Sequence, residues 1–168
     1  MERTSGDGRF ATADGTSLYY RWHRPAEERG RVILVHGAAE HADRYGHLVE
    51  TLLAGGWSVH ACDHRGLGRS EGLRGHVSDF GTYARDLAAF VEHIGGTDLP
   101  QVVYGHSMGG LIAIEYVAEH AEGLAGVVLS APGIRLFRPP GRWTLRFGRF
   151  FAAFLPLLPM PPGIDPEG

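Results

Sequence analysis

The chain has 168 residues, of which 43% are hydrophobic and 21% are charged, and this balance is typical of a globular protein with a sizeable core. It excludes a disordered chain, a collagen-like chain and a small disulfide scaffold, and the net charge of −3 argues against a general nucleic-acid binder. All sixteen basic residues are arginine, so no lysine is available for Schiff-base chemistry. The one cysteine, Cys62, excludes an internal disulfide and suits a reducing compartment.

The sequence shows no export or membrane segment. Its first ten residues are polar and lack the apolar centre of a signal peptide. The longest apolar run, 150–160, has about eleven residues and contains two prolines, whereas about twenty are needed to span a bilayer. We therefore expect a cytoplasmic protein.

Strand and helix patterns alternate along the first 130 residues. Short apolar runs predict strands at 10–12, 18–22, 32–35, 57–62, 102–104 and 127–129. Helical spacing predicts helices over 45–53 and 108–120, and a third one over 80–94 capped by Ser78. The stretch 63–76 holds four glycines and is predicted to be a loop. Apolar strands separated by helices indicate an α/β fold with a mostly parallel sheet that is covered on both faces.

The C-terminal tail differs in composition from the rest of the chain. Aromatic residues follow helical spacing within 142–155, and three arginines fall on another side of the same predicted helix. Such a helix can lie on a membrane or lipid surface, or it can cover an apolar substrate site. It can equally pack on its own domain with a solvated arginine face.

The strongest chemical signal is the G-x-S-x-G pattern from Gly105 to Gly109. An apolar strand is predicted to run into this pattern and a helix to leave it, which is the setting of a nucleophile elbow. There Ser107 would sit on a strained turn with its hydroxyl exposed. The glycines would allow the strand and the helix to approach closely. The other interpretation is a serine that simply caps a helix.

A second segment, His36-Gly37-Ala38, follows the predicted strand 32–35. In a nucleophile-elbow fold, this loop and the residue after the nucleophile each supply one backbone N–H to the oxyanion hole. Those donors would be the amides of Ala38 and Met108. The alternative is an ordinary turn at the end of a strand.

Several motifs occur in an order and spacing that resemble the α/β-hydrolase superfamily, and within it the monoacylglycerol lipase and lysophospholipase group of serine aminopeptidase S33-type hydrolases. The resemblance covers roughly residues 8–134. The matching stretches are 36–41, 44–45, 63–72, 77–80, 105–110 and 129–132. It implies Ser107 as nucleophile and an oxyanion hole at Ala38 and Met108, with His36 in the oxyanion loop and His106 supporting the elbow. It also implies acylglycerol or lysophospholipid-like ester substrates, an acyl-enzyme intermediate and no cofactor.

The chain differs from this family because it lacks the triad acid and the triad histidine at the expected positions. The triad order is serine, then acid, then histidine, but the only histidine after Ser107 is His120, which a helix would place almost ~20 Å away. The next acid after the strand ending at Ser130 is Asp165. We therefore expect about six strands, with the triad acid and base absent from the chain. The expected organisation is an N-terminal part of a hydrolase core at 1–133 and the beginning of a lid at 134–168.

Other histidines could replace the missing base only if a carboxylate oriented them. His36, His41, His64 and His106 lie near the expected site, and none has an obvious carboxylate partner in the sequence. His60, Cys62 and His64 suggest a metal site only weakly, and we expect none. The stretch 66–71 lacks the third glycine of a dinucleotide-binding loop, so nucleotide binding is rejected.

The sequence thus predicts a serine hydrolase of carboxylic esters whose chemistry is incomplete in this chain. Three explanations stay open. The chain can be a truncated part of a whole enzyme, it can be complemented by a separate chain that supplies the last strands, or it can be a catalytically inactive remnant that binds lipid or protein.

Overall fold

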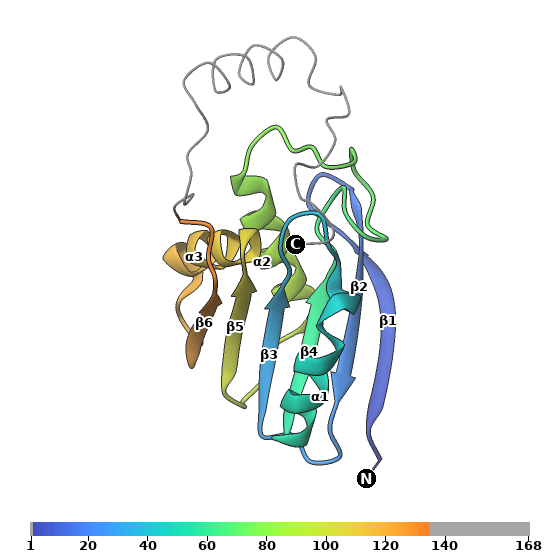
Figure 1. The fold of residues 1–168 in the computed structure, drawn as a ribbon, viewed down its shortest axis with the longest axis vertical. Helices are drawn as coiled ribbons and strands as arrows, with labels where there is room; N and C mark the ends of the chain where they lie inside the picture. The colour runs from blue at the N-terminus through green and yellow to red at the C-terminus, as the bar shows by residue number, and fades with distance from the viewer. Residues whose placement is uncertain (1, 135–168) are drawn as a thin grey trace, which may run out of the picture. The chain divides into compact units, whose positions relative to one another are not determined.

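The computed structural model describes residues 2–134, which form a mixed sheet with helices on both faces (Figure 1). The strands are β1 (Thr4–Ala11), β2 (Ser17–Arg24), β3 (Gly30–Val35), β4 (Trp57–Cys62), β5 (Gln101–His106) and β6 (Gly126–Ser130). The helices are α1 (Gly46–Ala54), α2 (Gly81–Ile94) and α3 (Met108–His120), and a 3₁₀ turn, η1 (Ala42–Tyr45), precedes α1. None of these helices is long and apolar enough to cross a membrane.

The six strands lie in the order β1-β2-β4-β3-β5-β6. β1, β2 and β4 pair antiparallel, and β4, β3, β5 and β6 are parallel to one another. The chain goes from β3 to β4 on one side and then returns to place β5 on the other side of β3. This reversal creates a switch point at the carboxyl ends of β3 and β5, where open α/β sheets bind their ligands. Val35 pairs with Gly105 there, so the two motifs that follow these strands lie side by side.

Helices cover the two faces of the sheet unequally (Figure 1). On one face, α1 packs Val49 and Leu53 against alternate residues of β3 and β4. On the other face, α2 and α3 enclose the larger core, in which Phe90 and Ile112 are fully buried. Each of these two side chains contributes about 2–3 kcal/mol through burial. The helical and strand periods of the sequence therefore lead directly to a three-layer α/β fold.

The α/β fold with a mostly parallel sheet and six strands is confirmed, whereas one predicted detail is wrong. Ser78 does not cap α2, because the helix begins at Gly81, with Phe80 at the N-cap position and no side-chain cap. The turn before it is made by Asp79, whose carboxylate accepts a hydrogen bond from the Gly81 amide at 3.3 Å. Ser78 lies too far upstream to reach the first turn.

The edge strand β6 exposes apolar side chains. Val127, Val128 and Leu129 are 38%, 49% and 39% exposed, and within residues 2–134 no strand pairs with the outer edge of β6. The lid predicted at 134–168, including the helix at 142–155, lies outside the described residues except for Ile134.

Candidate active site

Ser107 is the single residue between a strand and a helix. β5 ends at His106 and α3 begins at Met108, and Ser107 has φ 53° and ψ −117°. Its amide donates to the carbonyl of Ser130 at 3.0 Å, and its carbonyl accepts from the amides of Gly110 and Gly133 at 3.0 and 3.2 Å. A left-handed backbone costs a serine about 1–3 kcal/mol, so these bonds hold a strained turn in place.

Glycines allow this turn to pack against β3. A Cβ atom on Gly109 would lie 2.1 Å from the carbonyl oxygen of Val35 and 2.5 Å from that of His36. A Cβ atom on Gly105 would lie 2.5 Å from the carbonyl oxygen of Gly109. Only glycine fits at either position, as the sequence predicts for an elbow. α3 therefore begins directly against the end of β3.

The loop after β3 faces Ser107. A Cβ atom on Gly37 would lie 3.3 Å from the Cβ atom of Ser107, so the two backbones nearly touch. The carboxylate of Glu40 accepts the Gly37 amide and also the hydroxyl of Tyr45. Among residues 2–134, the amides of Ala38 and Met108 donate to no acceptor. They are thus available to an oxyanion, which is the role that the sequence predicts for them.

His36 and His64 lock this loop to the end of β4. Nε2 of His36 accepts the His64 amide at 3.0 Å, and Nε2 of His64 lies 3.0 Å from the carbonyl oxygen of His36. Nδ1 of His36 lies 2.8 Å from the carbonyl oxygen of Gly37, and the two rings are 4.0 Å apart. This pattern requires His36 to carry its proton on Nδ1 and His64 to donate from Nε2. Burial lowers the pKa of both imidazoles, so both are neutral.

These contacts decide which histidines can act as base. His36 and His64 are committed to backbone hydrogen bonds, and Nδ1 of His106 lies 3.2 Å from the hydroxyl of Ser130. His120 is the last residue of α3, about 18 Å along the helix from its first residue. In the part of the chain that the structure describes, no histidine ring is hydrogen-bonded to Ser107. The hydroxyl therefore has no general base there.

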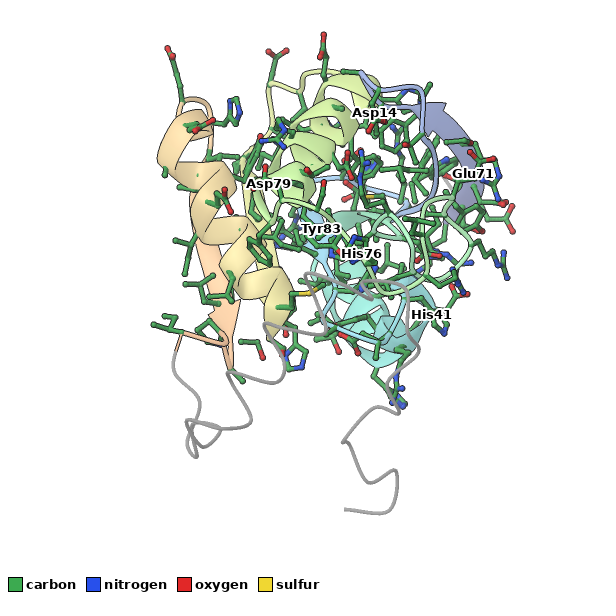
Figure 2. The ribbon with its side chains drawn as sticks, turned by 90° about the horizontal axis from the view of Figure 1, so that it is seen from above. Asp14, His41, Glu71, His76, Asp79 and Tyr83 are labelled. Atoms are coloured by element: carbon green, nitrogen blue, oxygen red, sulfur yellow. The ribbon has the colours of Figure 1, made fainter. Side chains whose placement is uncertain are left out.

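Two side chains that the sequence reasoning passed over fix the long loop between β4 and α2. The buried carboxylate of Asp63 accepts the amides of Ala42 and Arg69 at 2.9 and 2.8 Å and so joins η1 to this loop. Arg65 donates to both carboxylate oxygens of Asp86 at 2.6 Å and to Asp14 at 2.8 Å. In Figure 2, which looks onto the molecule from above, Asp14 lies near the top of the picture, Glu71 at the right and His76 near the centre. The only sign of this role in the sequence was the run of charged residues directly after a buried strand.

Two further predicted candidates lie in the sheet. Cys62 is buried, and burial raises the pKa of its thiol. His60 is buried beside Arg31, and burial lowers the pKa of its imidazole to about 3. Among residues 2–134, no three histidine, cysteine or acidic side chains are arranged to hold a metal ion.

A hollow of about 490 Å³ borders the oxyanion loop, and we refer to it as the arginine groove. Its walls come from the loop after β3 and the loop after β4. They include Ala39, Glu40, Asp43, Gly68, Arg69 and Arg74. His41, labelled in Figure 2, also lines it. Ser107 is not part of its wall.

A strained serine between strand and helix, beside a loop with free amides at the sheet's switch point, defines an α/β-hydrolase fold with a nucleophile elbow. Comparison with known proteins agrees, since the family described as serine aminopeptidase, S33, matches residues 26–168. The chain belongs to this family.

Relatives and solved structures point to the same group. The chain is 40% identical over 138 residues to a monoacylglycerol lipase of Mycolicibacterium smegmatis, covering 80% of this chain and 49% of that protein. It is 42% identical over 126 residues to human monoglyceride lipase, covering 73% of this chain and 42% of that protein. The chain thus spans about half the length of the curated relatives it matches.

Two solved structures show the same fold. A soluble variant of monoglyceride lipase from Saccharomyces cerevisiae, in complex with a substrate analogue, superposes with a TM-score of 0.76. It is 27% identical, and the match covers 100% of this chain and 58% of that one. A monoacylglycerol lipase from Paleococcus ferrophilus gives a TM-score of 0.71 at 31% identity, covering 99% and 57%.

Proposed function

We propose that this chain carries the nucleophile half of a carboxylic ester hydrolase of the monoacylglycerol lipase or lysophospholipase type. The observation that carries the proposal is the backbone of Ser107, held in a left-handed turn against the loop after β3, in which the Ala38 amide has no acceptor among residues 2–134. A backbone strained in this way is typical of functional sites. The likeness to monoglyceride lipases supports the same substrate class.

In the proposed reaction, the hydroxyl oxygen of Ser107 attacks the ester carbonyl and forms a tetrahedral intermediate. The amides of Ala38 and Met108 donate to its oxyanion, with the positive end of α3 adding to their effect. Collapse of the intermediate releases the alcohol and leaves an acyl-enzyme, which water then hydrolyses. Losing one such donor costs about 3–4 kcal/mol of transition-state stabilisation.

Proton transfer is the step that residues 2–134 do not support. The Ser107 proton must pass to a base, and the leaving alcohol must receive one. In a serine protease, removing the histidine lowers turnover by about 10⁶. We therefore propose that the 168-residue chain alone has little or no esterase activity, and that the acid and the base come from outside residues 2–134, from a longer form of this protein or from a separate chain.

The test is hydrolysis of p-nitrophenyl octanoate by the chain, alone and mixed with the C-terminal half of the Mycolicibacterium smegmatis relative. We expect little turnover alone, turnover with the added half, and none when Ser107→Ala replaces the chain. A rate typical of a complete enzyme from the chain alone would contradict the proposal. Binding of a single-chain lipid with no turnover under either condition would favour a catalytically inactive lipid-binding module.

A further inference from the structure

The arginine groove lies next to the proposed oxyanion hole. Ala39, which lines the groove, directly follows the proposed donor Ala38, and consecutive Cα atoms are about 3.8 Å apart. Glu40 also lines the groove and accepts the Gly37 amide, which faces Ser107. A group attached to an ester held at this hole can therefore extend into the groove.

Positive charge exceeds negative charge around the groove. Arg69 and Arg74 line it, and Arg21 and Arg44 lie beside its carboxylates. Against these four guanidinium groups stand three carboxylates, those of Glu40 and Asp43 in the wall and that of Asp63 directly behind Gly68, which leaves an excess of one positive charge. Asp43 pairs with both Arg21 and Arg69, the latter at 3.8 Å. Glu40 lies 3.9 Å from Arg44. Within residues 2–134, no carboxylate lies within ion-pair distance of Arg74, so its charge is not compensated there.

The hydrogen bonds of the two arginines that line the groove go to neutral groups, and the only carboxylate within ion-pair distance of either guanidinium among residues 2–134 is Asp43, 3.8 Å from Arg69, which leaves donors to spare. Nη1 of Arg69 donates to the hydroxyl of Tyr19 at 2.9 Å, and its guanidinium lies 5.0 Å from the centre of the Tyr19 ring. Nη1 of Arg74 donates to the carbonyl of Gly68 at 3.1 Å. A guanidinium has five N–H donors, so each arginine can still make a bidentate contact with an oxyanion.

The wall between these arginines is bare backbone. Gly68 has φ 50°, and a Cβ atom there would lie 2.1 Å from a carboxylate oxygen of Asp63. A side chain here would collide with the buried Asp63, so this part of the wall consists of backbone alone. The space beside the guanidinium groups stays open to a ligand.

We propose that the arginine groove binds the phosphate of the substrate's alcohol portion through Arg69 and Arg74. The substrate class is then a single-chain ester of glycerol phosphate rather than a neutral monoacylglycerol. This inference rests on the proposed ester-hydrolase function, which it deepens by naming the head group. Inorganic phosphate shares the recognised chemistry but lacks the acyl chain that Ser107 would meet.

The test measures binding, so it does not depend on turnover. Calorimetric titration of the Ser107→Ala chain compares 1-octanoyl-glycerol 3-phosphate with 1-octanoylglycerol, both below their micelle concentrations. We expect the phosphate ester to bind roughly tenfold tighter or more, as a charge-assisted bidentate contact would give. Arg74→Gln should abolish this preference. Arg74→Lys should keep part of it, because the charge remains while the bidentate geometry is lost.

Arg85→Gln is the matched control, because Arg85 is an exposed arginine on α2 that pairs with Asp79. It should leave the preference unchanged. Equal affinity for the two lipids would overturn the inference, as would a preference that survives Arg74→Gln or disappears equally in Arg85→Gln. Inorganic phosphate binding as tightly as the phosphate ester would also overturn it, by showing a free-phosphate site. Failure of the proposed hydrolysis would be seen separately. The reconstituted pair would then show no turnover, while the groove would still bind the phosphate ester more tightly than the neutral lipid.

Discussion

Replacing Gly109 by alanine tests the close contact on which the candidate site is built. The added Cβ atom would lie 2.1 Å from the carbonyl oxygen of Val35, whereas ordinary contacts of this kind begin at 3.4 Å. The start of α3 must then retreat from β3 by about 1 Å, since neither backbone can rotate out of the way. Overpacking of a well-packed interior costs about 1–3 kcal/mol, and the upper end applies here because both partners are backbone.

The same shift should disable the chemistry. A displacement of about 1 Å at a catalytic group can cost 10²-fold in rate, because Ser107 and the amide of Met108 move together with the start of α3. Urea unfolding gives the stability change, and hydrolysis by the reconstituted pair gives the rate. Gly133→Ala is the control, since its Cβ atom would meet Leu111 at an ordinary 3.6 Å. A Gly109→Ala chain within 0.5 kcal/mol (about the scatter of neutral surface changes) of the parent would refute the reasoning.

Three further predictions follow from the described residues. Burial lowers the pKa of His36, His60 and His64, so the unfolded chain takes up protons first and stability is lost as the pH falls below about 6.5. Urea unfolding should show His60, whose pKa is about 3, costing about 2 kcal/mol at pH 5 relative to pH 7, with a further loss in the same direction from His36 and His64, and a flat profile would contradict their burial. Asp86→Asn leaves the half-buried guanidinium of Arg65 without its bidentate partner. It should lower the free energy of unfolding by about 3 kcal/mol in the same urea assay, and an unchanged unfolding midpoint would contradict this. The chain should aggregate through β6, and Val128→Lys should raise its soluble fraction in sedimentation, whereas a parent chain that melts sharply and reversibly as a monomer would count against an exposed edge.

Most of the fold could be predicted from the sequence because its apolar residues follow clear strand and helix spacings. The apolar run 57–62 coincides with β4, and the helix predicted over 108–120 coincides with α3. Strand ends were predicted less accurately, because β1 begins six residues before the predicted 10–12 and β2 starts one residue before and ends two residues after the predicted 18–22. Their pairing with each other carries polar residues such as Thr4 and Arg24 into the sheet, and no apolar period marks them.

The candidate site, like the fold, could be predicted only in part. The turn at Ser107 and the narrow contact at Gly109 were predictable, because glycine spacing reports backbone geometry directly. The interlock of His36 with His64 was not, since it joins residues 28 positions apart whose contact depends on the order of β3 and β4 in the sheet. The role of Glu40 as acceptor for the oxyanion loop was missed for a similar reason, because a glutamate in a loop has no sequence signal for burial.

We propose that Ser107 is a nucleophile whose base lies outside residues 2–134. Intact-mass measurement after treatment with a fluorophosphonate probe tests this most directly, with peptide mapping to locate the label and Ser107→Ala as control. We predict slow labelling of the chain alone and labelling at Ser107 that is at least 10²-fold faster when the C-terminal half of the Mycolicibacterium smegmatis relative is added. Fast labelling of the chain alone, or a label on any residue other than Ser107, would contradict the claim.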